Sequence, residues 1–283
     1  DRKAVAIAAQ HCRRRAQEEG GLIMRKLLVT GAIAAASLVT AAVAIAAGTT
    51  PHPPHKHWHF QGPFGTYDRA AAQRGYQVYH EVCAACHSLS LLAYRNLMEL
   101  GLTENQAKDL IKDIQVPDLN DDGQPIERPA RLSDRFKKPF PNEAAAAAAN
   151  NGKAPPDLSV IIKARENGPD YVHALLTGYV PFDKLTPEQI KEFAVTKDDN
   201  FNKYFPGHKI AMAPPLTDDK VTYVDGTKAT TDQEASDVVE FLAWASEPHM
   251  EDRKRTGVRV VLFLLAMAGL MYAVKRSVWS DKH

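Results

Sequence analysis

The sequence predicts a mainly α-helical fold with long loops, followed by one helix that spans a membrane. Apolar residues recur near helical spacing in several stretches, and no alternation of apolar and polar residues is long enough to indicate a useful strand. Residues 260–274 are fifteen apolar residues without a charge. The 283 residues, 45% of them hydrophobic, leave room for one sizeable core or two small ones.

Residues 24–46 have the form of a signal peptide. Arg25 and Lys26 precede a long alanine-rich apolar stretch, and Ala44-Ile45-Ala46 has the small-x-small form of a cleavage site. A retained membrane anchor is the alternative, because the stretch is long enough to span. We interpret residues 1–23 as the remainder of an upstream reading frame or of a fused precursor, and exclude them from the fold.

The C-terminal apolar run predicts a transmembrane anchor over 256–275, with 276–283 as a tail. Residues 257–276 would cover about 30 Å, the thickness of a bilayer core. A buried helix of a soluble core is the alternative, but basic clusters on both sides of the run favour the membrane. Cleavage of the export signal would put 47–252 outside and the tail in the cytoplasm.

The exported part is acidic. Residues 47–252 hold 21 Lys and Arg against 30 Asp and Glu, a formal charge of −9. This charge argues against nucleic acid and favours a basic partner, although a solvated acidic surface explains it equally well. Three cysteines are too few for a disulfide scaffold, and Cys12 lies in the excluded segment.

The elements are expected in the following order. Residues 47–65 are a Pro/His-rich lead-in; its histidines could bind a metal, but no carboxylate or cysteine is interleaved, which favours a tethering segment. Helices are expected over 68–89, capped by Asp68, and over 91–100, with Leu91, Tyr94 and Met98 on one face. A short alanine helix is expected within 142–152, closed by Asn-Asn-Gly, and another helix in a part of 154–179 after Pro155 and Pro156. The last is expected over 231–246, with a capping box of Thr231 and Glu234. Long loops are expected over 115–142 and 201–232.

Cys83-Ala84-Ala85-Cys86-His87 is the attachment pattern for c-type haem. Positions i and i+3 of a helix lie on one face, so both thiols can reach the two vinyl groups of one porphyrin. His87 is then held under the iron. A zinc site would need a second ligand pair, and a thioredoxin-type pair would need neither this histidine nor a leading helix.

The sixth iron ligand decides between an electron carrier and an open haem that acts as a catalyst or gas sensor. The candidates in the exported part are Met98, Met212, Met250, His173, His208 and His249. Met98 is more typical of a core residue. Met212 is favoured because Pro214 and Pro215 stiffen the backbone after it, with His208 as the rival and a packed surface methionine as the alternative.

Four blocks together resemble the cytochrome c1 family of the bc1 complex, in its alphaproteobacterial form. They are "WHFQGPFGTYDRAAAQRGYQVYHEVCAACHSL", "ANNGKAPPDLSVIIKARENGPDYVHALLTGY", "YFPGHKIAMAPPL" and "WASEPHMEDRKRTGVRVVLFLLAMAGLMYAVKR", covering roughly 58–278 in order. The resemblance implies a class I cytochrome c fold with loop insertions, anchored by one C-terminal helix.

The resemblance also implies roles for individual residues. Cys83 and Cys86 would bind one haem covalently, with His87 and Met212 as its axial ligands. Arg165 matches the arginine that pairs with a haem propionate. Further positions near the haem are matched by Asn150, Pro155, Pro156 and Tyr171.

By the same resemblance the chain is a redox subunit of ubiquinol–cytochrome c reductase, and no enzyme on its own. It would take an electron from the Rieske iron–sulfur protein, beside cytochrome b, and pass it to a soluble or membrane-bound cytochrome c. The haem domain would lie in the periplasm, held to the cell (inner) membrane. A docking patch is expected among Glu99, Glu104, Asp109, Asp113, Asp118, Asp121 and Asp122.

Two other functions stay open on the residues alone. A membrane-tethered cytochrome shuttle outside any complex would carry the same haem motif and anchor. A peroxidase-type enzyme would need an open sixth position and usually a second haem, whereas the chain has one CxxCH motif.

Overall fold

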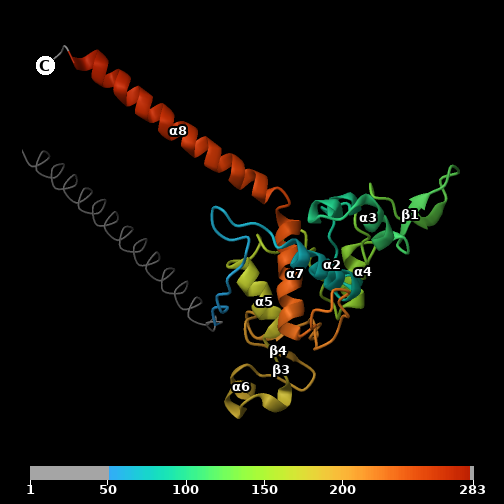
Figure 1. Ribbon diagram of the computed structural model, residues 1–283. Coiled ribbons are helices and arrows are strands. Elements are labelled where there is room, and N and C mark those ends of the chain that lie inside the picture. The colour runs from blue at the N-terminus through green and yellow to red at the C-terminus, as the bar shows by residue number, and fades with distance from the viewer. Residues whose placement is uncertain (1–50, 281–283) are drawn as a thin grey trace, which may run out of the picture. The chain divides into compact units, whose positions relative to one another are not determined.

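The computed structural model describes residues 51–280 (Figure 1). The expected precursor segment, the signal peptide and Cys12 lie outside the described residues. The α-helices are α2 Arg69–Glu81, α3 Glu104–Ile111, α4 Glu143–Ala149, α5 Gly168–Thr177, α6 Pro187–Glu192, α7 Thr231–Ser246 and α8 Met250–Trp279. The 3₁₀ helices are η1 Cys83–Ala85, η2 Tyr94–Leu100 and η3 Phe182–Lys184. The strands are β1 Gln115–Leu119, β2 Pro125–Pro129, β3 Tyr179–Val180, β4 Asn200–Asn202 and β5 Lys209–Ile210. The mainly α class is confirmed.

Helices α2 and α7 cross at the centre of the domain. Gly75 is buried at the crossing, where a Cβ atom would lie 1.9 Å from the carbonyl oxygen of Asp237 and 2.7 Å from Cβ of Phe241. Only a residue without a side chain allows this approach. Arg74 fastens the same crossing, because its Nε and Nη2 donate to the two carboxylate oxygens of buried Asp237, both at 2.9 Å.

The main core forms around this helix pair. Phe241 and Trp244 of α7 are fully buried, and Tyr76 and Tyr79 of α2 pack on Phe241 with ring centroids 5.7 Å apart. Burial of large aromatic side chains is the strongest apolar contribution a small domain can make. The haem motif follows α2 directly, so this core sets where the motif lies.

The predicted start of α2 is confirmed, but its predicted end is wrong. Asp68 caps the helix by accepting the amide of Ala71 at 3.0 Å. The α-helix ends at Glu81, and the motif forms the 3₁₀ helix η1 instead of continuing α2. The amides of Cys86 and His87 both donate to the carbonyl oxygen of Cys83, at 3.1 and 2.9 Å, which tightens the chain into a turn.

The stretch 91–100 was expected to be helical with Leu91, Tyr94 and Met98 on one face and Met98 in the core, and the structure differs. Leu91 is 61% exposed and Met98 is 38% exposed, so Met98 is not a core residue. The segment forms η2, whose side chains repeat every three residues. That period turns Tyr94, Leu97 and Leu100 inward instead.

The expected loop over 115–142 contains a hairpin that the sequence did not indicate. Strands β1 and β2 pair antiparallel, with Gln115 opposite Pro129 and Leu119 opposite Pro125. Prolines in both strands argued against pairing, but each strand of a two-stranded ribbon is an edge strand and tolerates them. Figure 1 shows the hairpin projecting from the domain beyond α3.

Two further corrections concern the segment before and at the start of α7. Strands β4 and β5 pair antiparallel within the expected loop 201–232. The cap of α7 is Thr230, whose hydroxyl accepts the amide of Gln233, so the expected capping box is wrong. Glu234 turns away and accepts the amide of Val221 at 3.0 Å. The end of α7 at Ser246 is confirmed.

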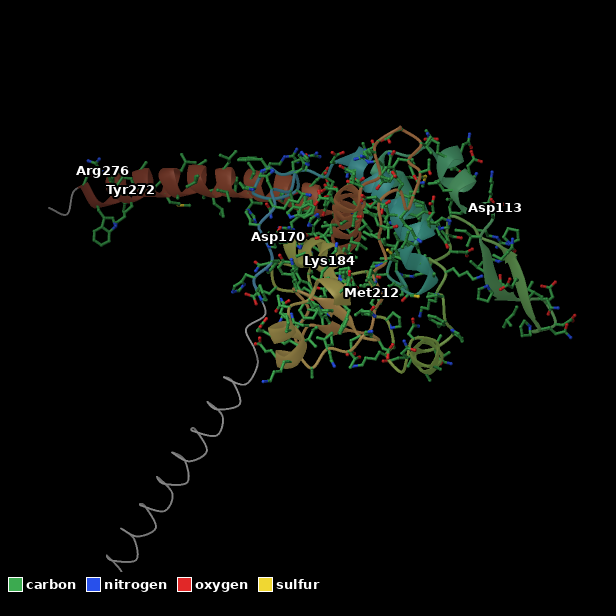
Figure 2. All side chains as sticks on the ribbon, turned by 90° about the horizontal axis from the view of Figure 1, so that it is seen from below. Asp113, Asp170, Lys184, Met212, Tyr272 and Arg276 are labelled. Atoms are coloured by element: carbon green, nitrogen blue, oxygen red, sulfur yellow. The ribbon has the colours of Figure 1, made fainter. Side chains whose placement is uncertain are left out.

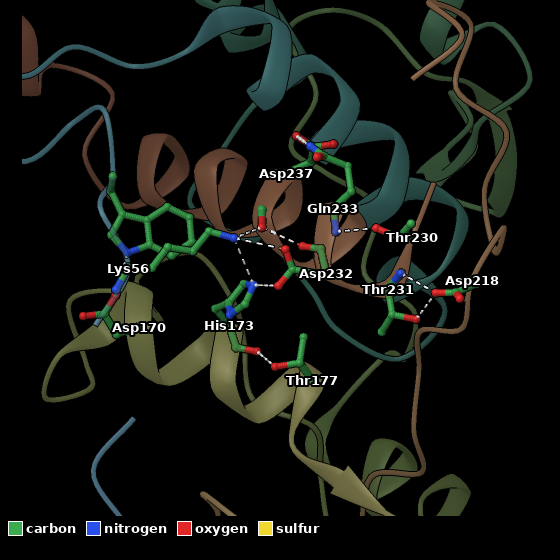
Figure 3. A network of polar contacts seen from close by, with 12 residues as sticks. Lys56, Asp170, His173, Thr177, Asp218, Thr230, Thr231, Asp232, Gln233 and Asp237 are labelled. Carbon is green, nitrogen blue, oxygen red and sulfur yellow. Dashed lines mark hydrogen bonds and ion pairs between the residues drawn. The ribbon is translucent and has the colours of Figure 1, made fainter. Parts of the chain in front are cut away.

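The lead-in is tied to the domain by polar contacts around Asp170 (Figure 3). This buried carboxylate accepts hydrogen bonds from Trp58 Nε1 at 2.7 Å and from the Lys56 amide at 3.2 Å, and pairs with Nδ1 of His55 at 2.9 Å. Within 51–280 no group of three or more histidine, cysteine or acidic side chains is arranged to hold a metal. The bond between His55 and Asp170 is of the kind that ties such a lead-in to the domain.

One basic residue, Lys254, anchors the start of helix α8 to the lead-in. Lys254 Nζ donates to the carbonyl oxygens of Phe60 and Gly65, at 2.6 and 3.0 Å. Helix α8 is 30 residues long in all, and none of its most apolar stretch is buried. Figure 2 shows Tyr272 and Arg276 on this protruding part. Its length and exposure fit a membrane-spanning helix.

Candidate haem-attachment site

The two cysteines lie on one side of a tight turn. Cys83 begins η1 and Cys86 follows it, and both are unpaired and half-buried. In a 3₁₀ helix the side chains at i and i+3 eclipse each other, so the thiols share a face more closely than on an α-helix. Burial raises the pKa of the Cys83 thiol to about 12, with the nearby Cys86 adding to the effect.

The raised pKa of the Cys83 thiol disfavours two kinds of chemistry. Disulfide exchange and zinc binding both need a thiolate, whose formation this surrounding opposes. Addition of a thiol to a porphyrin vinyl group leaves a neutral thioether, which an apolar surrounding accommodates. The electrostatics of η1 therefore agree with haem attachment.

His87 is held by its Nδ1 atom. This nitrogen lies 2.8 Å from the carbonyl oxygen of Pro156, which can only accept, so Nδ1 carries the proton and Nε2 keeps its lone pair. Burial lowers the pKa of His87, while Pro156 and the charge of Asp157 act against that shift. A neutral, oriented imidazole with free Nε2 is the form in which histidine binds iron.

Asp157 joins the segment after the prolines to the haem motif, a contact that sequence reasoning missed. Its carboxylate accepts the hydroxyl of Ser88 at 2.9 Å, the amide of Ser90 at 3.0 Å and the amide of Ser159 at 2.8 Å. Burial opposes the charge, but the hydrogen bonds from Ser159 and Ser90 outweigh it and lower the pKa of Asp157 to about 2. The sequence offered one hint of this contact, namely that Asp157 directly follows Pro156, a residue expected near the haem.

Met212 lies in the loop after β5, half-buried (Figure 2). The hydroxyl of Tyr179 donates to its carbonyl oxygen at 3.1 Å, so β3 fastens the loop from one side. Sequence reasoning missed Tyr179 as well, since nothing near Met212 in the chain points to it.

The rival ligands are engaged elsewhere or exposed. His208 is buried, with Nδ1 3.1 Å from the carbonyl oxygen of Asn202 and its ring stacked on Phe201. His173 pairs with Asp232 at 3.0 Å. Met98 is partly exposed, Met250 is buried at the start of α8, and His249 precedes that helix. This leaves Met212 as the methionine on a short, proline-bounded loop.

The other expected site residues differ in how the structure places them. Pro156 contacts His87 directly, and Tyr171 packs against the same main core as Cys83. Arg165 is exposed, and within residues 51–280 it donates only to the carbonyl oxygen of Ala164, at 3.0 Å. Asn150 ends α4, with Nδ2 on the carbonyl oxygen of Ala146 at 2.8 Å.

The structure therefore brings part of the expected site together. Cys83, Cys86, His87 and Pro156 form one unit. Among residues 51–280, no hydrogen bond or ion pair joins this unit to Asn150, Arg165 or Met212. The donor set itself, two thiols on one face beside an oriented neutral imidazole, fits a covalent c-type haem.

Comparison with known proteins agrees with this donor set. Residues 58–282 match the model of the Cytochrome C1 family. The chain is 43% identical to cytochrome c1 of Rhodospirillum rubrum over 93% of this chain and 99% of that protein, and 43% identical to the mitochondrial cytochrome c1 haem protein of Saccharomyces cerevisiae over 94% and 87%. It is 48% identical to cytochrome b/c1 of Bradyrhizobium diazoefficiens over 82% of this chain, which spans only 36% of that longer protein. The chain belongs to the cytochrome c1 family.

Proposed function

We propose that this chain is the haem-carrying electron-transfer subunit of a cytochrome bc1 complex, a quinol–cytochrome c oxidoreductase. The observation that carries the proposal is the family match, whose range of 58–282 takes in the end of the lead-in, the CxxCH motif and the membrane helix. The oriented His87 supports it, because a proximal iron ligand needs this tautomer.

The chain's own residues divide the work of holding one haem. Cys83 and Cys86 would attach it, and Nε2 of His87 and the thioether of Met212 would bind its iron. Arg165, exposed and with most of its donors unused by the described residues, is suited to a propionate. A haem held in this way would supply a one-electron couple, whose potential a methionine ligand raises.

The membrane helix and the acidic domain indicate the partners. Helix α8 anchors the chain beside cytochrome b and the Rieske protein, with the haem domain in the periplasm and the C-terminus in the cytoplasm. The chain receives an electron from the Rieske protein and passes it to a cytochrome c. The formal charge of −9 over 47–252 suits a basic cytochrome c by electrostatic steering.

Ion pairs within the domain reduce the number of carboxylates that are free to attract a basic cytochrome c. Glu104 pairs with Lys108 at 2.6 Å and Asp118 pairs with Arg128, so these two carboxylates are partly neutralised. The others proposed for docking keep no ion pair within the described part of the chain: Glu99, Asp109, Asp113, Asp121 and Asp122. Figure 2 shows Asp113 toward the β1–β2 hairpin.

Neutralising the docking carboxylates tests the surface. Asp113→Asn combined with Asp121→Asn and Asp122→Asn should slow electron transfer to a basic cytochrome c about tenfold at low salt, and less at high salt, because the salt screens the steering. Stopped-flow rates against ionic strength measure this. Glu192→Gln, on α6, is the matched control. An unchanged rate and salt dependence would place the docking surface elsewhere.

Purification of the full chain from its membrane tests the whole proposal. Cytochrome b and the Rieske protein should co-purify, and the pyridine haemochrome should give one haem per chain that denaturation does not release. Cys83→Ala combined with Cys86→Ala should abolish covalent attachment. Covalent haem without the two partners would instead support a membrane-tethered shuttle.

A further inference from the structure

We propose that Asp157 is a positioning residue for His87, because it fastens the turn that carries Pro156 onto the haem-binding peptide. By this fastening it sets the orientation and the basicity of the His87 imidazole. The inference rests on the proposed function, since it concerns His87 as an iron ligand.

The hydrogen bonds of Asp157 bridge two segments that are 67 to 69 residues apart in the chain. One oxygen, Oδ2, accepts both the hydroxyl of Ser88 and the amide of Ser90, while Oδ1 accepts the amide of Ser159 in its own segment. The single carboxylate of Asp157 thus holds together the haem-binding peptide and the segment after Pro156, a contact that we call the junction. Carboxylate acceptors make stronger hydrogen bonds than neutral ones, so this is the firmest polar link there.

Two neighbouring bonds continue the same junction. The amide of Leu158 donates to the carbonyl oxygen of Ser88 at 2.8 Å, and the amide of Leu91 donates to the hydroxyl of Ser159 at 3.1 Å. His87 immediately precedes Ser88, Pro156 immediately precedes Asp157, and the bond between His87 and Pro156 is 2.8 Å long. The length and direction of the His87 bond therefore depend on how well the junction is closed.

The charge of Asp157 acts on His87 as well as its geometry. No lysine, arginine or histidine pairs with this carboxylate among the described residues, so its negative charge is left without a neutralising cation. A negative charge behind the Nδ1–H bond increases the electron density that the imidazole offers to a metal. More donation stabilises the ferric over the ferrous state.

The test uses the full-length, haem-loaded protein with the subunits that co-purify. Asp157→Asn keeps the shape but removes the charge and places an amide donor against other donors. Its ferrous-to-ferric ratio at a fixed applied potential should rise about tenfold, which is ~59 mV for a one-electron couple. The ferric NMR signal of the His87 Nδ1 proton should move in the same variant.

Two further variants keep the outcome decisive. Ser88→Ala removes one of the three bonds and should raise the ratio about twofold to threefold, and it replaces Asp157→Asn if that variant does not accumulate with haem. Asp199→Asn is the matched control, because Asp199 Oδ2 accepts the amide and hydroxyl of Thr196, both at 2.8 Å, in a loop away from the motif. Its ratio should equal that of the parent.

Each result supports or overturns the inference. A normal ratio and an unmoved Nδ1 proton in the Asp157 or Ser88 variants would overturn it, as would an equal shift in Asp199→Asn. If the parent itself shows no covalent haem spectrum, the proposed function fails, which is a different observation from an unshifted ratio in a normal haem protein.

Discussion

The segment behind His87 and the segment that carries Met212 are held in different ways. Residues 155–159 are joined to the haem peptide by five hydrogen bonds, two of them from backbone amides to side-chain oxygens. Residues 211–216 have one hydrogen bond within the described part of the chain, from the hydroxyl of Tyr179 to Met212. The first segment is fixed by its polar contacts, whereas the second has two prolines and this single polar contact.

This difference indicates which side of the site can give way. An imidazole held at Nδ1 keeps its geometry before any iron binds, since the protein alone determines it. A methionine loop with one polar anchor gains much of its order from the bond that Met212 would make. We therefore expect changes behind His87 to alter the redox couple, and changes around Met212 to alter access to the iron.

The largest expected effect comes from opening the α2–α7 crossing, which we take to support both segments. Gly75→Ala would place a methyl group 1.9 Å from a backbone oxygen of α7, so the α2–α7 crossing must open. We expect a loss of about 3 kcal/mol or more in the free energy of unfolding, or no folded protein at all. Thermal unfolding followed by circular dichroism measures it.

Gly257→Ala is the control for that change, because no atom lies within 4 Å of the added Cβ. It should leave the unfolding temperature of the domain unchanged. A Gly75→Ala protein with normal stability would mean that the crossing is not the common support of the two segments.

A smaller effect concerns buried Glu240, which supports the same crossing. Burial raises the pKa of Glu240 to about 7, with the nearby carboxylates Asp68 and Asp237 contributing. The pKa of Glu240 is higher in the folded than in the unfolded protein. The stability that neutral Glu240 contributes is therefore fully present below pH 4.5 and is lost as the pH rises through 7. Glu240→Gln keeps an acceptor for the Asp68 amide without the charge.

Glu240→Gln should therefore be more stable than the parent at pH 8 by roughly 2 to 3 kcal/mol, and equal to it near pH 4.5. Chemical unfolding at both pH values compares the two proteins. Glu192→Gln, at an exposed position of α6, should differ from the parent in stability at neither pH. An identical difference at both pH values would exclude titration of Glu240 as the cause.

The smallest effect is confined to the Met212 segment. Tyr179→Phe removes its one hydrogen bond, worth about 1 kcal/mol, so an external ligand such as imidazole should displace Met212 about fivefold more easily. Tyr204→Phe is the control, because the Tyr204 hydroxyl bonds to none of the described residues. Loss of the redox couple in Tyr179→Phe would contradict the expectation that changes around Met212 alter access to the iron and changes behind His87 alter the couple.

Local signals in the sequence predicted the parts of the fold that local contacts determine. Asp68 begins α2 because a carboxylate at that place accepts a free amide, and α7 ends at Ser246 as its periodicity indicates. The CxxCH spacing likewise predicted haem attachment from residues that lie next to one another in the chain. In each of these cases the interacting groups are neighbours in the chain.

The parts that sequence reasoning missed depend on partners far along the chain. Asp157 meets Ser88 across 69 residues, and Tyr179 meets Met212 across 33, so neither contact leaves a local pattern. The prolines of β1 and β2 concealed a real hairpin because an isolated ribbon tolerates them. Residues 91–100 were expected to follow the 3.6-residue period of an α-helix, whereas η2 repeats every three residues, so Met98 does not share the buried face of Tyr94.

Carbon monoxide binding to the reduced protein tests most directly that Met212 closes the sixth position of a haem held by Cys83, Cys86 and His87. The parent spectrum should not change on addition of carbon monoxide, whereas Met212→Leu should keep its covalent haem and bind the gas. His208→Leu, with a side chain that the structure engages elsewhere, should behave as the parent. A parent that binds carbon monoxide readily, or a Met212→Leu protein that does not, would contradict the account.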